Sequence, residues 1–485
     1  MDINKLDLRG DAAAVTPIPL PGDSATQRAI RQSAHGATLG SLMDDMPAGA
    51  LHRFVVWVVG IGLFFDMYEI FLVSSIGSAL QHDFGFNRQS ADFKLLLASA
   101  FIGMFFGSLC LGSLADRIGR RKAFVFNLVW YSAFSLVGAF SVNADMLVLC
   151  RFLTGIGVGA IYPVADSYLS EILPKERRGR LAAWAYTVSY VAVPLVGFLA
   201  VWLNPLHVGT VAGWRIILAI GGLGGVFILF VQHRLPESPR WLLARGRVDE
   251  ACAELRRFAQ SAGMSLPAVI SEGAAKPHAM GLRERIAVLR QAPYGRRYVM
   301  LGIFHLFQAF GYYGFGTLAS TVVKSRGFDV TDGTLFMALS FLGYPVGSLL
   351  SIPLLNWVER RTLVITAILS IAVFGFGFAY SDNTFLIVAF GVLTTCASNV
   401  FSNAYHIYQA EIFPARVRST AIGSTYALSR IVSGSLPFIL LPVLNQHGPG
   451  AMFGVISAAL LIVAITVRAL GPLTTRRSQD EINPV

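Results

Sequence analysis

The chain has 485 residues, of which 54% are hydrophobic and only 14% are charged, and its mean hydropathy is +0.59. The charged fraction lies far below the roughly 25% of soluble globular domains, so a soluble protein is excluded and an integral membrane protein is expected. The formal net charge is +11. Because membrane chains collect Lys and Arg in their cytoplasmic loops, this charge indicates orientation rather than nucleic-acid binding.

The chain begins with a polar segment, residues 1–53, that contains Pro17, Pro19 and Pro21. This segment lacks the basic n-region and short apolar core of a signal peptide, so we expect a cytoplasmic tail rather than a cleaved leader. A short helix is predicted at Leu39–Asp45, ahead of the first membrane span.

Apolar runs long enough to cross about 30 Å of hydrocarbon, at about 1.5 Å per residue, predict twelve membrane helices. In chain order they cover 54–80, 93–115, 122–142, 145–170, 180–203, 213–232, 297–323, 333–356, 362–380, 383–411, 417–444 and 449–470. The long interruption between the sixth and seventh spans is rich in Arg and divides them into two sets of six. The expected organisation is a cytoplasmic tail (1–53), an N-terminal half (54–232), a central cytoplasmic loop (233–296), a C-terminal half (297–470) and a cytoplasmic C-terminal tail (471–485).

Basic residues mark one side of the predicted bundle. The loops after spans two and four carry Arg117, Arg120, Arg121 and Lys122, and then Lys175, Arg177, Arg178 and Arg180. The loops on the other side contain few basic residues, so the positive-inside rule places the basic loops and both termini in the cytoplasm. Within the central loop, apolar residues at helical spacing over Val248–Ala259 predict an amphipathic helix at the membrane surface, although a solvated loop would fit the same composition.

The two halves share an internal repeat. An offset of 240 positions aligns Gly107-Ser108-Leu109 with Gly347-Ser348-Leu349, Arg120-Arg121 with Arg360-Arg361, and Glu171-Ile172 with Glu411-Ile412. One offset that holds at three separate places predicts two related halves. Parallel halves that face each other suit a protein that opens a midplane site alternately to either side.

The loop after span two reads Gly112-Ser113-Leu114-Ala115-Asp116-Arg117-Ile118-Gly119-Arg120-Arg121-Lys122. This segment resembles the loop signature of the major facilitator superfamily, G-x-x-x-D-R-x-G-R-R-K. The resemblance implies an all-α membrane fold of twelve helices in two pseudo-symmetric six-helix halves. It also implies a gating latch, in which Asp116 at a helix end holds charge and dipole partners of its own half. A merely basic cytoplasmic loop would account for the Arg and Lys residues but not for the placed Gly and Asp.

Other segments resemble two branches of that superfamily. Leu153–Gly159 and Pro236–Leu242 are similar to the sugar porters, whereas Asp66–Glu69 and Tyr408–Arg418 are more similar to metabolite and aromatic-acid:proton symporters. The double-Gln sugar contact expected in span seven is reduced to Gln308. These resemblances extend the expected gating latch to Gly112, Asp116, Arg117, Gly119, Arg120, Arg121, Glu171, Arg178, Glu237, Arg240, Glu411 and Arg418.

Ionisable side chains within the spans are costly to bury and are therefore candidates for function. Asp66 and Glu69 share a helix face in span one, and Arg151 in span four lies at a similar depth, so Glu69 and Arg151 are predicted to pair. A buried acid that faces Arg in one state and water in another couples proton binding to conformation. We expect proton coupling from Asp66, Glu69 and Arg151, with a permanent structural ion pair as the alternative.

Arg430 lies close to the midplane of span eleven, and no acid shares its helix. A guanidinium in this position is suited to bind a carboxylate through two hydrogen bonds, unless it pairs with an acid of another span such as Asp66. The other candidate substrate-binding residues are polar and aromatic side chains of spans seven and ten: Gln308, Tyr312, Tyr313, Asn399, Asn403 and His406.

These features together predict a secondary active transporter that moves a small organic metabolite, a carboxylate or aromatic acid, by proton symport with alternating access. Its partners would be the substrate, protons and the lipid bilayer, without nucleic acid, cofactor or metal, and we expect a monomer in a bacterial plasma membrane. A sugar or polyol porter is the alternative within transport, and a transporter-like membrane sensor is the alternative from another class. No HExxH, GxSxG or Gly-rich nucleotide-binding segment indicates an enzyme or ATP-driven transport.

Overall fold

The computed structural model describes residues 39–86, 90–111, 114–208, 211–266, 281–325, 330–475 and 482–483. Within these residues, ten helices are long and apolar enough to cross a membrane. One of them, α20 (Ala415–Leu470), breaks at Gly448, where φ is 80°, a conformation that glycine adopts without strain. Because α20 crosses twice and α15 (Tyr294–Ser325) supplies the seventh crossing, the bundle has the twelve crossings predicted from the sequence.

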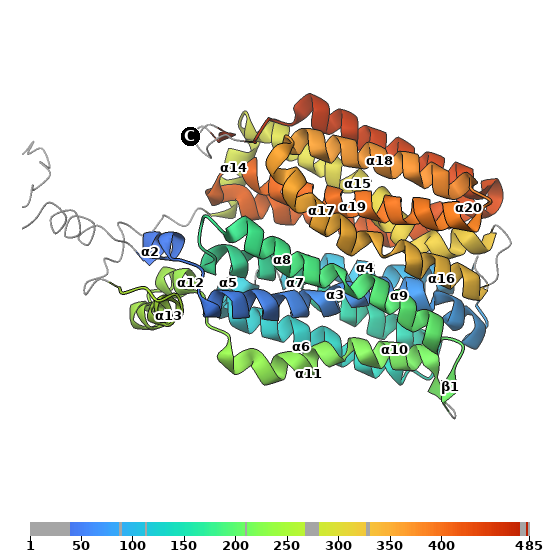
Figure 1. Cartoon of the computed structure of the whole chain (residues 1–485), viewed down its shortest axis with the longest axis horizontal. Helices are drawn as coiled ribbons and strands as arrows, with labels where there is room; N and C mark the ends of the chain where they lie inside the picture. Colours follow the sequence, from blue (N-terminus) through green and yellow to red (C-terminus); the bar gives the residue numbers. More distant parts are fainter. Residues whose placement is uncertain are drawn as a thin grey trace, which may run out of the picture.

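Six crossings form each half of the molecule, and Figure 1 shows the two halves side by side. The N-terminal half contains α3 (Ala50–Asp83), α4 (Ala91–Cys110), α6 (Arg120–Ala139), α7 (Ala144–Ile172), the pair α8 (Arg178–Tyr190) and α9 (Ala192–Leu203), and the pair α10 (Gly213–Gly221) and α11 (Leu223–Val231). The C-terminal half contains α15, the pair α16 (Val330–Ser340) and α17 (Gly343–Trp357), α18 (Arg360–Tyr380), α19 (Thr384–Glu411) and α20. Pro194 and Pro345 follow the breaks in two of these pairs, where a residue without an N–H cannot complete the helical ladder.

The two ends of the bundle carry different elements (Figure 1). At one end lie the short helices α2 (Leu39–Asp45), α5 (Leu114–Ile118), α12 (Pro239–Ala244), α13 (Val248–Ser261) and α14 (Leu282–Arg290). We call this the basic end, because the loops that carry Arg117, Lys175 and Arg177 lie there. The opposite end carries a small hairpin of β1 (His207–Val208) and β2 (Val211–Ala212). Helix α2 has the bounds that the sequence predicted.

Glycines bring neighbouring helices into backbone contact, and they repeat between the halves. On α4, a Cβ at Gly103 or Gly107 would overlap backbone carbonyls of α7. A Cβ at Gly343 or Gly347, at the same positions of the second half by the 240-residue offset, would overlap the backbone of α19. Small residues four apart allow this close approach in membrane helices. The repeat inferred from the sequence is therefore also a repeat of packing.

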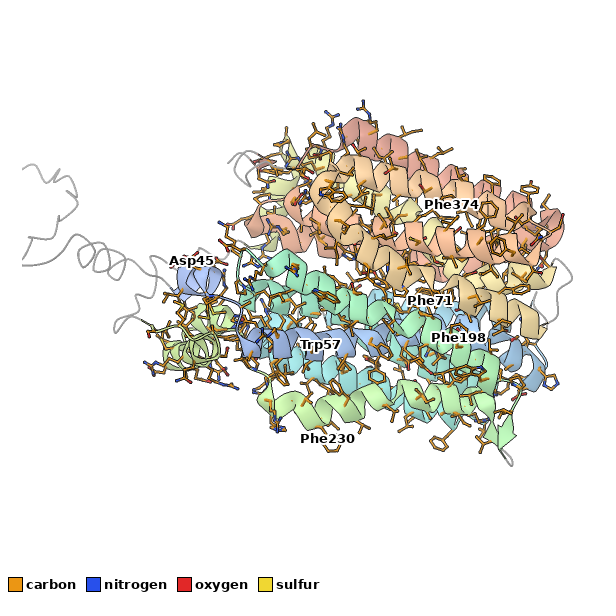
Figure 2. The ribbon with its side chains drawn as sticks, viewed as in Figure 1. Asp45, Trp57, Phe71, Phe198, Phe230 and Phe374 are labelled. Carbon is orange, nitrogen blue, oxygen red and sulfur yellow. The ribbon has the colours of Figure 1, made fainter. Side chains whose placement is uncertain are left out.

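The halves touch each other firmly towards the opposite end. A Cβ on Gly197 of α9 would lie only 3.0 Å from the Cα of Ala338 on α16. Phe71 of α3, at the boundary of the halves in Figure 2, packs edge to face on Phe341 and Tyr344 with ring centres 5.4 and 5.3 Å apart. These contacts close the path between the halves at that end.

The amphipathic helix predicted in the central loop is α13, and its apolar face packs on other helices of the protein. Leu255 and Phe258 are fully buried, and the Phe258 ring lies 4.8 Å from that of His52 on α3. Helices α3, α12 and α2 cover this apolar face, so the amphipathic helix is confirmed, and its position at the membrane surface stays a prediction.

Candidate functional site

The most deeply buried ion pair of the N-terminal half joins α3 to α7. Arg151 Nη1 lies 2.5 Å from Glu69 Oε2, and Arg151 Nη2 donates to the Glu69 backbone carbonyl at 2.8 Å. The hydroxyl of Ser135 on α6 donates to the second carboxylate oxygen of Glu69. Gly221 leaves room for that oxygen, since a Cβ there would overlap it. The structure thus brings together the two residues that the sequence predicted to pair.

Asp66 lies one turn from Glu69 on α3 and is fully buried. Neither oxygen of its carboxyl group accepts a hydrogen bond from a described residue. Arg430 of the other half acts on it electrostatically as the opposite charge, and Glu69 as the like charge. A carboxyl group in this setting can take up or release a proton without breaking a structural hydrogen bond.

Arg430 is the buried cation of the C-terminal half, and it is only 2% exposed. Its Nη1 donates to the Tyr313 hydroxyl at 2.5 Å and its Nη2 donates to the Tyr426 hydroxyl. The guanidinium carbon lies 4.6 Å from the centre of the Tyr426 ring, and Nε has no partner among the described residues. Two neutral tyrosines therefore hold this cation, and Asp66, which the sequence left open as a partner, makes no ion pair with it.

Helix α15 presents three of the predicted substrate-binding residues near this cation. Tyr312 and Tyr313 pack edge to face, with ring centres 4.8 Å apart. Gln308 lies one turn from Tyr312 on the same helix and is 2% exposed. Tyr313 reaches across the boundary of the halves, where its ring centre lies 5.2 Å from that of Phe101 on α4. Tyr313 therefore contacts Arg430 directly and Tyr312 packs on Tyr313, while Gln308 lies one turn away on the same helix.

His406 of α19 joins the same group through aromatic contacts. Its ring stacks on Tyr405 at 4.3 Å and lies 6.4 Å from the ring of Tyr426, the residue that contacts Arg430. His406 Nδ1 also pairs with Gln409 Nε2 at 3.3 Å. The structure therefore places His406 within the cluster around Arg430.

Asn399 and Asn403 lie on the face of α19 that packs on α17. The Asn399 side-chain amide donates to the backbone carbonyl of Tyr344 at 2.5 Å. The Asn403 amide donates to the hydroxyls of Ser348 and Ser351 at 3.2 and 2.7 Å. The structure does not bring either amide to Arg430, and these contacts join two helices of the C-terminal half.

Asp166, an acid within a membrane-spanning helix, was not among the candidates predicted from the sequence. Asp166 of α7 accepts a hydrogen bond from the Tyr186 hydroxyl of α8. The Tyr186 ring lies 6.4 Å from His406, so this acid stands beside the boundary of the halves, closer to the basic end than Arg430 does. The signal was available, because Asp166 is an acid inside a predicted span, the same criterion that selected Asp66.

Among the residues predicted to form the gating latch of the N-terminal half, Glu171 and Glu237 accept contacts from the start of α6. Arg120 Nη2 lies 2.8 Å from Glu171 Oε1. Glu237 Oε1 accepts from the backbone N–H groups of Arg120 and Arg121 at 2.9 and 3.1 Å, at the N-terminus of α6, where the helix dipole favours an anion. Burial raises the pKa of the Glu237 carboxyl, and its hydrogen bonds from Ser238, Arg121 and Arg120 lower it in part.

Of the other residues of the loop signature, the structure describes some and not others. Gly119 has φ of 105°, and a Cβ there would overlap the Glu237 carboxylate, so only glycine fits without strain. Arg117 is exposed. Gly112 and the side chain of Asp116 lie outside the described residues.

Arg178 and Arg240, which the sequence grouped with the latch acids, meet a different residue. Arg178 Nη2 lies 2.7 Å and Arg240 Nη2 lies 2.8 Å from the same Asp44 oxygen on α2. These two arginines of the predicted latch therefore share a contact with Asp44. No local pattern indicates this contact, because Asp44 lies in a polar segment beside another acid, Asp45.

The corresponding residues of the C-terminal half repeat the Arg–Glu ion pair of the N-terminal half. Arg360 Nε lies 2.8 Å from Glu411 Oε1, as Arg120 meets Glu171. Arg418 Nε donates to the Phe413 carbonyl at 3.2 Å, and Arg178 Nε donates to Leu173 at the same distance. None of these four ion pairs joins the N-terminal half to the C-terminal half.

The described groups favour binding and proton transfer over bond chemistry. Within the described ranges, no three His, Cys, Asp or Glu side chains are grouped to hold a metal ion. The arrangement consists of one buried acid, Asp66, in the field of a buried cation of the other half, Arg430, and of the Glu69–Arg151 ion pair one turn along α3. Such a group can bind an anion and a proton at the boundary of two bodies.

Known proteins are similar to this chain in sequence and in fold. A family model described as "Sugar (and other) transporter" matches residues 55–485. The niacin transporter NiaP of Acinetobacter baylyi is 28% identical over 445 residues, which cover 92% of this chain and 99% of that protein. The inner membrane metabolite transport protein YgcS of Escherichia coli is 27% identical over 440 residues, which cover 89% and 94%. The structure of the proton:xylose symporter XylE superposes with a TM-score of 0.71 at 19% identity, over 89% of this chain and 98% of that chain, a likeness of fold alone.

Proposed function

We infer the function from a family membership: the chain belongs to the sugar (and other) transporter family of the major facilitator superfamily. It is therefore a multi-pass membrane transporter and not an enzyme. We propose that it moves a small organic carboxylate, such as an aromatic acid, by proton symport with alternating access. The observation that carries this proposal is Arg430, a buried cation whose partners among the described residues are neutral tyrosine hydroxyls and rings.

A buried guanidinium without an acid in contact favours an anionic ligand. A carboxylate can accept two parallel hydrogen bonds from it, whereas a neutral sugar would leave its charge largely uncompensated. The similarity to a niacin transporter supports this substrate class, because niacin is an aromatic carboxylic acid. The sugar or polyol porter remains the second candidate, supported by the family description and by the segments that resemble the sugar porters.

Proton coupling rests on Asp66, Glu69 and Arg151. Protonation of Glu69 would remove its ion pair with Arg151 and leave both free to take a second arrangement. Asp66 shares the field of Arg430 with any bound carboxylate. Because a bound anion offsets the charge of Arg430, the anion and a proton on Asp66 favour each other's binding. This mutual preference is the linkage that symport requires.

We propose that the basic end faces the cytoplasm, in accord with the positive-inside rule. Both termini would then be cytoplasmic, with residues 1–53 and 471–485 as tails, 233–296 as the central loop, and 54–232 and 297–470 as the moving halves. The contacts of Gly197 and Phe71 close the opposite, external end. We propose that the chain works as a monomer in the plasma membrane and that the arrangement described, which is closed at its external end, is the inward-facing one.

Binding to the purified protein in detergent tests the substrate class. Nicotinate and its neutral amide differ little in shape but differ in charge, and xylose represents the sugars. We expect nicotinate, or another aromatic or short carboxylate in a panel, to bind more tightly than its amide and more tightly than xylose. Arg430→Lys keeps the charge but loses the planar pair of donors, so its affinity for the carboxylate should fall by more than about tenfold.

Arg256→Lys is the matched control, because Arg256 is exposed on α13. It should leave the affinity unchanged. A protein that binds xylose better than every carboxylate, or an Arg430→Lys variant with unaltered affinity, would contradict the proposal and favour the sugar porter. Binding without any uptake into proteoliposomes would instead favour the membrane sensor.

A further inference from the structure

We propose that Asp44, on the short helix ahead of the first membrane span, sets the balance between the two access states by neutralising Arg178 at the boundary of the halves. Asp44 is thus a positioning residue of the transport cycle that acts through Arg178. The inference rests on the proposed function only in assuming that the halves move; it does not depend on the substrate or on proton coupling.

Asp44 joins three segments that are far apart in the chain. Its Oδ1 lies 2.7 Å from Arg178 at the first residue of α8 and 2.8 Å from Arg240 of α12. Its backbone carbonyl accepts from the N–H of Lys175 at 3.0 Å. Arg240 also donates to the backbone carbonyl of Gly40 on α2, at 3.2 Å. One carboxylate therefore ties α2 to the turn between α7 and α8 and to the segment that follows α11.

Helix α2 is anchored firmly enough to hold this carboxylate in place. Its apolar residues Leu39, Leu42 and Met43 are buried, and the helix packs on α12 and α13. The link from α2 to α3 is equally tight, since a Cβ at Gly49 would overlap the backbone of Ser261 at the end of α13. A firmly held acid loses little side-chain entropy when it forms an ion pair, so its contact is stronger than that of a free surface pair.

The partner that Asp44 neutralises faces a like charge in the other half. Arg178 and Arg418 occupy equivalent positions of the two halves by the 240-residue offset. Arg178 acts electrostatically on Arg418 across the boundary as a like charge, and Glu411 acts on it as an opposite charge. Closing the basic end must bring the two halves together at this level. The repulsion between the two guanidinium groups opposes that closure, and the negative charge of Asp44 reduces the repulsion. Loss of the charge should therefore favour the state that is open at the basic end.

The test measures access from the basic end to the boundary of the halves near Arg430, without any substrate. Gly423 lies on the same face of α20 as Tyr426 and Arg430, and a Cβ there would meet open space. In a variant whose four native cysteines are replaced, Gly423→Cys reports access through its rate of alkylation by a membrane-impermeant maleimide. The proteins compared are wild type, Asp44→Asn, Asp44→Glu and the exposed neighbour Asp45→Asn.

We expect Asp44→Asn to raise the alkylation rate by about two- to fivefold, the range open to a partly exposed ion pair. Asp45→Asn should match wild type, and Asp44→Glu should restore the wild-type rate. Adding Arg178→Gln to Asp44→Asn removes the uncompensated charge and should return the rate towards wild type. A purely structural role predicts the reverse, a double variant at least as perturbed as the single one.

An unchanged rate in Asp44→Asn, or a double variant that stays as reactive as Asp44→Asn, would overturn the proposal. If Asp44→Asn alone unfolds, the double variant still tests the proposal. Removal of the Arg178 charge should then restore both folding and the wild-type alkylation rate. A result of either kind leaves the substrate class untouched, since no ligand is present in the measurement.

Discussion

Glu69 is held by groups from three helices, and this setting defines what a single substitution does. Arg151 supplies the opposite charge, Ser135 donates to the second oxygen, and Gly221 leaves the space for it. A Gln at this position keeps the volume and resembles the protonated acid. It therefore fixes the site in one protonation state without opening a cavity.

We predict that Glu69→Gln abolishes accumulation driven by a pH gradient while substrate exchange between preloaded proteoliposomes continues. Exchange needs the halves to alternate but needs no net proton release. Glu250→Gln, on the exposed surface of α13, is the control and should behave as wild type. If Glu69→Gln still concentrates substrate against its gradient, the coupling proton binds elsewhere.

The functional candidates that could be predicted from the sequence are charged residues within apolar segments. Glu69, Arg151 and Arg430 are charges within apolar runs, so depth along each helix was enough to predict that the first two meet. Asp44 is an ordinary acid in a polar segment, and its contacts depend on where α2 packs against helices formed two hundred residues later. Long-range placement of this kind is a property of the fold and leaves no local pattern.

At the scale of helices, backbone contact between α4 and α7 rests on glycines of both. A Cβ at Gly155 of α7 would overlap the carbonyl of Ala100, just as Gly103 meets Phe152. The contact is therefore two-sided, and a side chain on either helix must separate them.

We predict that Gly155→Val destabilises the folded protein by about 1–3 kcal/mol, the usual cost of overpacking a tight interface. Gly454→Val on α20 is the control, because a Cβ there meets open space. Thermal unfolding of the two detergent-purified variants should show a lower midpoint for Gly155→Val only. Equal midpoints would mean that the helices separate at no cost.

Apolar length predicted the crossings well, because a membrane imposes one minimum length on every span. Two departures have physical causes. The loop expected at 445–448 is helical up to Gly448, since one residue with positive φ suffices to turn the chain. The apolar face of α13 is covered by protein rather than lipid. Helical periodicity cannot distinguish these two environments, because both bury the same face of the helix.

For the whole molecule, the two halves are joined tightly at the opposite end, and this contact must open during transport. Gly197 against Ala338 is one of its closest points. We predict that Gly197→Trp holds that end open, because the indole cannot fit between α9 and α16. Uptake should be lost, and alkylation of Gly423→Cys from the basic end should slow as that end closes.

Gly454→Trp, at a site with open space, is the matched control and should transport normally. A Gly197→Trp variant that transports at the wild-type rate would mean that the halves do not separate at this contact. A folded but inactive variant with unchanged alkylation would place the defect in something other than access.

The central claim, symport of an organic anion with protons, is tested most directly in proteoliposomes that contain the purified protein. The measurement is accumulation of the radiolabelled carboxylate that binds best, with an imposed pH gradient and with none, beside its neutral amide and xylose. The account predicts accumulation of the carboxylate above its external concentration only when the external side is acidic, and no such accumulation of the amide or the sugar. Accumulation of xylose under the same gradient, or equilibration of the carboxylate that ignores the gradient, would contradict it.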